Sequence, residues 1–215
     1  MIISPNCKIV VGITQRIDSV PGRTELRDAL DQRLAQWLLH SGFLPVAVPN
    51  TLAVTEDADK PTLEDWVRAI QPNALILSGG NDIGEHPTRD ATERYLLSWA
   101  EAKWIPVLGV CRGLQMMAVW AGTNLVKKGG HVGSRHQLVI PARKDDWPAN
   151  VNSFHNWGLA SCPKGFEVAA QAEDNSIEAI KHSQLPWEGW MWHPEREMPF
   201  SLQDIKRLKR LFNGQ

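Results

Sequence analysis

Apolar and polar residues alternate along the first half of this chain in blocks that predict strands followed by helices. Short apolar runs rich in β-branched residues predict buried strands, which lie at 8–13, 44–49, 74–78 and 105–110. Apolar residues at helical spacing predict helices between and after these strands, at 25–42, 62–70, 89–103 and 114–122. Strands that alternate with helices are typical of parallel βαβ units, so this pattern predicts a three-layer α/β fold.

Two of the predicted helices carry specific local signals. The helix at 25–42 would place five large apolar residues on one face, namely Leu26, Leu30, Leu34, Trp37 and Leu38. The helix at 62–70 opens with Thr62, and Asp65 follows three residues later. This pair has the spacing of a capping box, which indicates where the second helix begins.

The second half of the chain has a different pattern. Two strand-like runs flank Asp174 and Asn175, which favour tight turns, and predict a hairpin. The segment WEGWMWHPE predicts a strand with an abrupt end, and 201–212 predicts a closing helix with Ser201 as its N-cap. No repeat, low-complexity linker or clean boundary appears, so we expect one domain over 1–215.

Composition and charge narrow the class of protein. With 215 residues and 43% hydrophobic content, the chain can bury one sizeable core. Its 23 basic and 24 acidic residues nearly cancel, which argues against a nucleic-acid partner. No apolar run is long enough to span a bilayer, and the first residues lack a secretory signal pattern. Three cysteines without framework spacing favour a reducing, cytoplasmic setting.

A cysteine between two glycines links the fourth predicted strand to the helix after it. Residues 109–113, GVCRG, have the form Gly-x-nucleophile-x-Gly, in which a sharp strand-to-helix turn exposes the middle residue. A helix N-terminus favours the thiolate, which is the reactive form of cysteine. Most free cysteines are small buried side chains. Here the strand, the glycines and the helix together predict that Cys111 is a nucleophile.

A histidine and a glutamate near the end of the chain supply the partners that such a nucleophile needs. His193 and Glu195 follow a strand-like run in the order His-Pro-Glu. Side chains two residues apart on an extended segment point the same way. We therefore expect the Glu195 carboxylate to orient the His193 ring, as the acid of a catalytic triad does. A histidine in a surface loop is the alternative interpretation.

A Gly-Gly turn after the third strand predicts backbone amides at the edge of the sheet where ligands bind. Gly79 and Gly80 follow a buried strand, and the carboxyl ends of strands form the ligand-binding edge of open α/β sheets. Their amides, with that of Arg112 after the nucleophile, would form an oxyanion hole.

These motifs together resemble a known superfamily. The segments LSGGND, GVCRGLQ and WHPE resemble the class I glutamine amidotransferases in order and spacing. The resemblance covers most of the chain, from VGITQR to HPERE, and VVGITQR and VNSFHN are similar to the free-standing γ-glutamyl hydrolase branch, which is peptidase C26-like. It implies a flavodoxin-like three-layer sandwich with a mostly parallel central sheet.

The resemblance also implies roles for individual residues. It implies Cys111, His193 and Glu195 as a triad, with the amides of Gly80 and Arg112 at the oxyanion. The positions that would hold the glutamyl substrate are Asn81, Gln115, Asn152, Ser153, Phe154 and His155. No cofactor is implied, and the chain shows no metal-ligand spacing.

The chemistry implied is hydrolysis of a γ-glutamyl amide through a thioester on the cysteine. Within the hydrolase branch, the segments CRGLQMMA, EAIKH and MWHPERE resemble hydrolases of a CDP-linked γ-glutamyl amidate, which serve phosphoramidate modification of surface polysaccharides. A second interpretation is a glutaminase subunit that delivers ammonia to a separate synthase, and a third is a non-catalytic binding protein. The small-molecule substrate, rather than a nucleic acid or a membrane, is the expected partner.

A nucleotide diphosphate would need basic or amide partners. The segment VKKGGHVGSRHQL, at 126–138, contains Lys128 and Arg135, with glycines that allow close backbone approach. We expect these two side chains to contact the phosphates, with Arg16 and Arg23 as further candidates. A solvated basic loop is the alternative interpretation of this segment.

Overall fold

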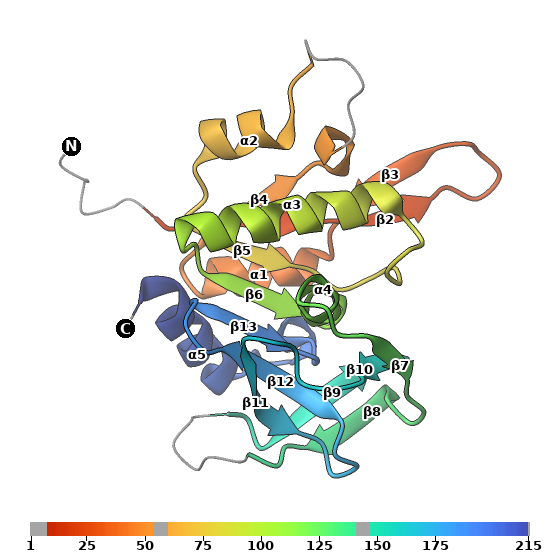
Figure 1. The fold of residues 1–215 in the computed structure, drawn as a ribbon, viewed down its shortest axis with the longest axis vertical. Coiled ribbons are helices and arrows are strands. Elements are labelled where there is room, and N and C mark those ends of the chain that lie inside the picture. Colours follow the sequence, from red (N-terminus) through yellow and green to blue (C-terminus); the bar gives the residue numbers. More distant parts are fainter. Residues whose placement is uncertain (1–7, 54–59, 141–146, 215) are drawn as a thin grey trace.

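The computed structural model describes residues 8–53, 60–140 and 147–214, and its centre is a seven-stranded sheet (Figure 1). The strand order is β11-β12-β13-β6-β5-β1-β4. Five strands are parallel, namely β13 (Trp187–Trp190), β6 (Val107–Val110), β5 (Ala74–Leu77), β1 (Val10–Thr14) and β4 (Leu44–Val48). At one edge β12 (Ile177–His182) and β11 (Phe166–Gln171) continue the sheet antiparallel. The predicted α/β fold with a mostly parallel sheet is therefore confirmed.

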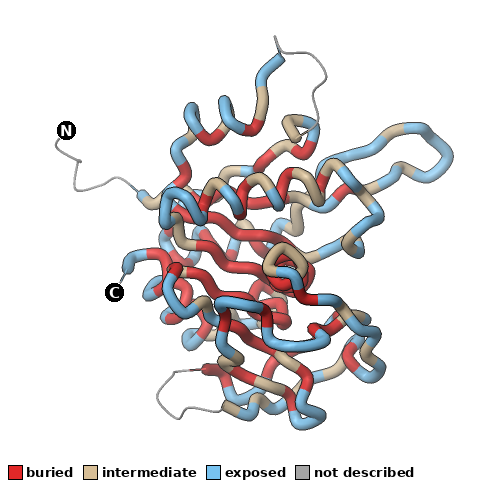
Figure 2. The backbone as a smooth tube through the Cα atoms, in the orientation of Figure 1, coloured by how far each residue is buried: buried red, intermediate tan, exposed pale blue. Residues whose placement is uncertain are grey.

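Helices cover both faces of this sheet, and two apolar clusters fill the space between the layers. Residues of α1 (Gln32–His40) and α5 (Leu202–Asn213) pack with one set of strand side chains, which includes Ile76 and Leu108. Residues of α2 (Leu63–Ile70), α3 (Pro87–Lys103) and α4 (Arg112–Trp120) pack with the alternate set, which includes Leu75 and Leu77. The strands accordingly form the buried centre of Figure 2.

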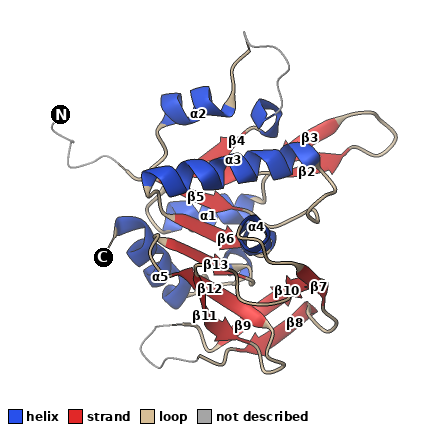
Figure 3. Ribbon diagram, viewed as in Figure 1, coloured by secondary structure: helices blue, strands red, loops and turns tan. Residues whose placement is uncertain are grey.

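Three two-stranded pairs extend the molecule beyond the central sheet (Figure 3). They pair β7 (Leu125–Lys127) with β10 (Trp157–Leu159), β8 (Val132–Gln137) with β9 (Asn150–Phe154), and β2 (Arg16–Ser19) with β3 (Leu26–Ala29). Two short 3₁₀ turns, η1 (Asn50–Ala53) and η2 (Pro194–Arg196), complete the described elements.

The helix predicted over 25–42 is wrong in its first third. Leu26–Ala29 forms strand β3 instead, and Leu26 is 62% exposed. The helix begins only at Gln32, where the carboxylate of the N-cap Asp31 accepts a hydrogen bond of 3.0 Å from the backbone N–H of Arg33. The spacing of Leu26 from the later apolar residues matches a helix only by coincidence. Pairing with β2 decides the conformation of this segment.

The other predicted elements are confirmed within a few residues. Thr62 and Asp65 form the predicted capping box of α2, and Ser201 caps α5. Asn175, in the left-handed region with φ of 65°, lies in the turn between β11 and β12. Across the described ranges, no helix combines the length and apolar composition needed to cross a membrane.

Candidate active site

Cys111 occupies a strained turn between β6 and α4. Its φ of 51° and ψ of −106° fall outside the usual regions for a residue with a side chain, and its N–H donates a 2.7 Å hydrogen bond to the carbonyl of Trp190. The flanking glycines are needed: a Cβ on Gly113 would lie 2.0 Å from the carbonyl oxygen of Leu77, and one on Gly109 would lie 2.6 Å from Met117 Sδ. This geometry is that of the predicted nucleophile elbow.

His193 and Glu195 lie next to this turn because β13 pairs with β6 in parallel. His193 Nδ1 and Glu195 Oε1 are 2.6 Å apart, and both side chains are buried. The expected contact is present, but the reason predicted for it is wrong. Residues 194–196 form a 3₁₀ turn rather than an extended segment, and the tight turn brings the carboxylate back to the ring.

The protonation of His193 depends on its two acidic neighbours. Burial alone would lower the pKa of the imidazole, but the negative charge of Cys111 and then the hydrogen bond to Glu195 outweigh burial and raise that pKa to about 9. The imidazolium form is therefore stable at neutral pH beside the sulfur. Such a pair provides both a nucleophile and a proton donor.

The Gly-Gly turn after β5 packs directly against His193. A Cβ on Gly79 would lie 2.7 Å from Cε1 of His193, so only glycine lets the ring sit there. Gly80 has a φ of 109°, which favours glycine, and a Cβ on it would meet Arg16. Arg89 donates hydrogen bonds to the carbonyls of Ser78 (2.7 Å) and Gly79 (2.9 Å), and these bonds fix the conformation of the turn.

A buried ionic network supports this turn and the elbow together. Glu93 accepts hydrogen bonds from Thr14 Oγ1 (2.9 Å) and Arg89 Nε (3.1 Å), and it also pairs with the Arg112 guanidinium, which contacts Asp90 as well. Burial lowers the pKa of Arg89 to about 10, and burial together with Arg89 lowers that of Arg112 to about 9. Both guanidinium groups remain cations at neutral pH, so each buried carboxylate of the network is paired with a positive charge.

A cavity of about 320 Å³ opens beside Cys111 and His193. Of the predicted site residues, Gly80, Asn81, Arg112, Gln115, Phe154 and His155 also line it. Gln115 is fixed there by a 2.9 Å hydrogen bond from Nε2 to the carbonyl of Trp157. The Asn81 side chain, in contrast, is occupied by the backbone of Ile17, to which it both donates and accepts.

Two predicted substrate-binding residues lie behind the cavity rather than in its lining. Asn152 accepts from the N–H of His193 (3.0 Å) and donates to its carbonyl (2.8 Å), so it holds the backbone of that residue. Ser153 is fully buried and donates to the carbonyl of His131 (2.8 Å). These contacts give both residues a positioning role.

The structure does not bring Lys128 and Arg135 to the cavity lining. Arg135 lies on β8, where it bonds to Asn150 (2.5 Å) and to Glu197 (3.0 Å). The stem of Lys128 packs against Gly158. Neither side chain lines the cavity beside Cys111, and their contact with the phosphates stays a prediction.

The cavity contains charged residues that the sequence did not single out. They are Asp82, Glu85 and Arg196, and the Arg196 guanidinium lies 4.7 Å from the ring of Phe154. The sequence could have indicated two of them by their position next to a motif, since Asp82 follows SGGN and Arg196 follows HPE. The two carboxylates suit the α-ammonium group of an amino acid, and the guanidinium suits an anionic group of the substrate.

Comparison with known proteins decides the family. The family model for glutamine amidotransferase class-I matches residues 25–208, which is most of the chain. The chain belongs to this family. The sequence is 31% identical over 212 residues to the γ-glutamyl-CDP-amidate hydrolase of Campylobacter jejuni, with 94% of this chain and 97% of that protein covered.

More distant relatives of this chain agree with that assignment. It is 24% identical over 219 residues to a γ-glutamyl-γ-aminobutyrate hydrolase of Escherichia coli O157:H7, which covers 86% of this chain and 85% of that protein. Its fold matches a crystal structure of a glutamine amidotransferase from Thermotoga maritima with a TM-score of 0.64 and 16% identity, over 97% of this chain and 84% of that one.

Proposed function

We propose that this chain hydrolyses the γ-amide bond of a γ-glutamyl conjugate, with Cys111 as nucleophile, His193 as acid and base, and Glu195 as the residue that orients His193. The observation that carries the proposal is the strained position of Cys111 beside a histidine that a carboxylate holds at 2.6 Å. Membership of the class I amidotransferases and similarity to two γ-glutamyl hydrolases support it.

The first half of the reaction forms a thioester. The Cys111 thiolate attacks the γ-carbonyl carbon, and the carbonyl electrons move to oxygen, where the N–H groups of Gly80 and Arg112 stabilise the negative charge. A well-placed donor of this kind contributes roughly 3–4 kcal/mol. The His193 imidazolium then gives its proton to the amide nitrogen, the carbon–nitrogen bond breaks and the amine leaves.

The second half releases glutamate. Neutral His193 takes a proton from water, and the resulting hydroxide attacks the thioester carbonyl at the same oxyanion site. The carbon–sulfur bond breaks, and the thiolate and imidazolium are restored. Glu195 stabilises the imidazolium in both halves without itself taking a proton.

We further propose γ-glutamyl-CDP-amidate as the substrate, so that the products are glutamate and cytidine diphosphoramidate for phosphoramidate modification of surface polysaccharide. The support is the 31% identity over nearly the whole length of the Campylobacter jejuni hydrolase. Arg196 is the better candidate for a phosphate contact than Lys128 or Arg135, because it lines the cavity with Cys111.

The alternative is a glutaminase that supplies ammonia to a separate synthase, which the family name itself suggests. Another γ-glutamyl amine is the alternative within the hydrolase reading, given the γ-aminobutyrate conjugate named for the Escherichia coli relative. Turnover by the chain alone distinguishes these functions, since an ammonia-supplying subunit shows little activity without its partner.

The test compares three substrates with the purified chain: glutamine, γ-glutamyl-γ-aminobutyrate and γ-glutamyl-CDP-amidate, each followed by release of glutamate. We expect the highest kcat/KM with the CDP conjugate. Arg196→Ala should then lower kcat/KM for that conjugate by about 10- to 100-fold, the loss of one charge-assisted phosphate contact.

Arg135→Ala and Lys128→Ala serve as matched basic controls that should leave the preference for the CDP conjugate unchanged. Equal losses with all three substrates for Arg196→Ala would place this side chain at the glutamyl group instead. Higher activity with glutamine than with either conjugate would contradict the proposed substrate.

A further inference from the structure

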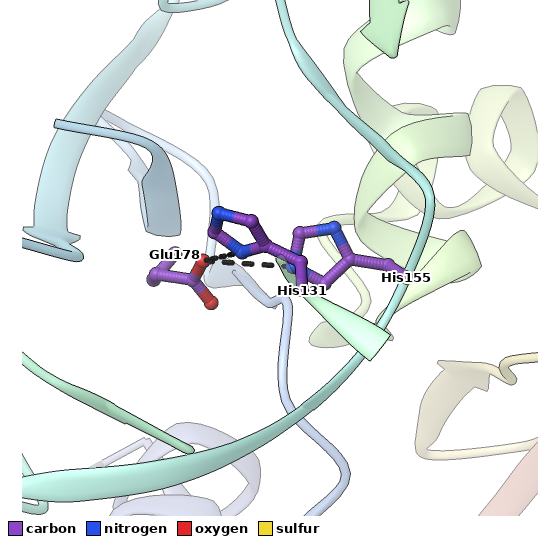
Figure 4. Close-up of side chains that lie close together, drawn as sticks. All are labelled: His131, His155 and Glu178. Carbon is purple, nitrogen blue, oxygen red and sulfur yellow. Dashed lines mark ion pairs between the residues drawn. The ribbon is translucent and has the colours of Figure 1, made fainter. Parts of the chain in front are cut away.

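Three buried side chains outside the cysteine chemistry converge on one point (Figure 4). His131 precedes β8, His155 follows β9, and Glu178 lies on β12. His131 Nδ1 and His155 Nε2 each lie 3.5 Å from Glu178 Oε1. All three side chains are at least 97% buried, and these atoms have no hydrogen-bond partner. A buried carboxylate without a hydrogen bond is costly, so something must offset its charge.

The outer hydrogen bonds of the two rings fix where their protons lie. His131 Nε2 contacts the Asp174 carboxylate at 3.0 Å, and His155 Nδ1 contacts the carbonyl of Trp157 at 3.0 Å. Both partners accept hydrogen bonds, so each ring carries its proton on that outer nitrogen. In each neutral ring, the nitrogen that faces Glu178 is therefore unprotonated, and its lone pair points at a carboxylate oxygen.

Lone pairs directed at one another repel unless a cation lies between them. Zinc binds histidine nitrogen at about 2.0–2.1 Å, which puts the ligand atoms of a tetrahedral site roughly 3.3 Å apart. The two 3.5 Å spacings from the histidines to Glu178 are close to this value. All three donor atoms lie within 4.8 Å of one another, so a small approach of the two rings would complete the site. We propose that His131 Nδ1, His155 Nε2 and Glu178 hold a divalent zinc ion.

The neighbours of the site also suit a metal. The pair formed by Asp174 and His131 is the arrangement in which a carboxylate orients a metal-binding histidine. His136, whose ring centroid is 4.2 Å from that of His131, has a buried Nε2 without a partner. Either a water or this nitrogen would complete four-coordination.

The role of the ion would be structural. It would tie the β8–β9 pair to β12, and His155 also lines the cavity beside Cys111. The three residues are far apart in sequence, so they show no metal-ligand motif and the sequence predicts no metal site. The site forms only when three distant segments pack together. The ion would hold a wall of the cavity without contacting the reacting atoms.

The test measures zinc binding directly. The full chain is stripped with a chelator, dialysed against zinc and analysed for metal content, while thermal unfolding is followed with and without zinc. We expect one zinc per chain and a rise in Tm of about 5–10 °C when zinc is about 100 times its Kd. Zinc absent from the dialysed chain, with no change in Tm, would overturn the proposal.

Three variants and one control locate the site. Glu178→Gln keeps the shape but removes the charge, and should weaken zinc binding at least about 100-fold; Asp174→Asn should weaken it by about 10- to 100-fold. His40→Ala, which removes an exposed histidine elsewhere, should leave it unchanged. Full zinc affinity in Glu178→Gln and also in His131→Ala would place the ion elsewhere and overturn the assignment. If Glu178→Gln does not fold, His131→Ala decides.

Discussion

Backbone strain at one residue supports the proposed chemistry. Holding Cys111 at positive φ costs of the order of 1–3 kcal/mol. Its hydrogen bond to the Trp190 carbonyl and the close packing of Gly113 on β5 offset that cost. The strained turn positions Cys111 at the start of α4, at the edge of one apolar cluster, where it lines the cavity.

Replacement of the nucleophile should abolish turnover without unfolding the chain. Cys111→Ala removes the atom that forms the thioester, so we expect no measurable glutamate release and an unchanged circular dichroism spectrum. A glutamine-like electrophile should modify the wild type once, and peptide mass analysis should place the adduct at Cys111. The exposed Cys162 is the internal control. Inactivation that accompanies modification of Cys162 or Cys7 instead would contradict the assignment; Cys7 lies outside the described residues.

The pH dependence should report the His193–Glu195 pair. Because the pKa of His193 is raised to about 9, the imidazolium that protonates the leaving nitrogen is present below that pH and is lost above it. We therefore expect kcat/KM to fall as pH rises through about 9. Glu195→Gln removes a group that raises this pKa, so the fall should move to lower pH while measurable activity remains.

His193→Ala is the comparison, and it should lose more activity than Glu195→Gln because the imidazole itself moves the proton. A pH profile of Glu195→Gln that matches the wild type in both position and height would show that Glu195 does not orient the histidine.

At the scale of elements, local signals predict most of the fold and distant pairing explains the exceptions. The capping box at Thr62 and the apolar run of β5 suffice to predict α2 and a buried strand. Strand β3 was missed because Leu26 has helical spacing, whereas its conformation depends on pairing with Ser19 across the hairpin. Local pattern carries no information about such a partner.

The packing of α4 on β5 gives a test at this scale. Gly113→Ala would place a methyl group 2.0 Å from the carbonyl oxygen of Leu77, so helix and strand would have to separate. We expect a loss of roughly 1–3 kcal/mol in the free energy of unfolding, or about 2–12 °C in Tm.

Gly129→Ala is the matched control, because a Cβ at Gly129 has no heavy atom within 4 Å and its φ is not left-handed. It should leave Tm unchanged. Equal unfolding curves for wild type and Gly113→Ala would mean that this contact does not limit the approach of α4 to β5.

At the scale of the whole molecule, the two ends of the parallel strands have different surfaces. The candidate site lies at their carboxyl ends, as the sequence motifs predict. A larger cavity, of about 1070 Å³, lies at the opposite ends, where Asn73, Pro106 and Pro186 precede β5, β6 and β13. A choice by size alone would place the candidate site at this larger cavity. The position of Cys111 places it at the smaller one. The side-chain contacts of Asn152 and Glu178 could not be predicted, because they depend on segments far apart in sequence.

An exposed aromatic residue at each end tests this difference. Trp104, which is 62% exposed, lines the larger cavity, whereas Phe154, 42% exposed, packs against His193. Trp104→Ala should leave kcat/KM within about twofold of the wild type. Phe154→Ala should lower it by up to about tenfold, the loss of one aromatic contact. A larger loss for Trp104→Ala would place substrate binding at the opposite end.

The position of β13 between β6 and β12 also sets an order of events on the ribosome. The cysteine-bearing turn is synthesised roughly 80 residues before the histidine, which is several seconds at about 5–20 residues per second. During that interval the partner of β6 on the β5 side is available, whereas its partner on the other side, β13, and the histidine have not been made. Until β13 is made, the nascent chain can expose an apolar strand edge of β6, which is a target for chaperones, and the thiol has its neighbouring histidine only after His193 has been added.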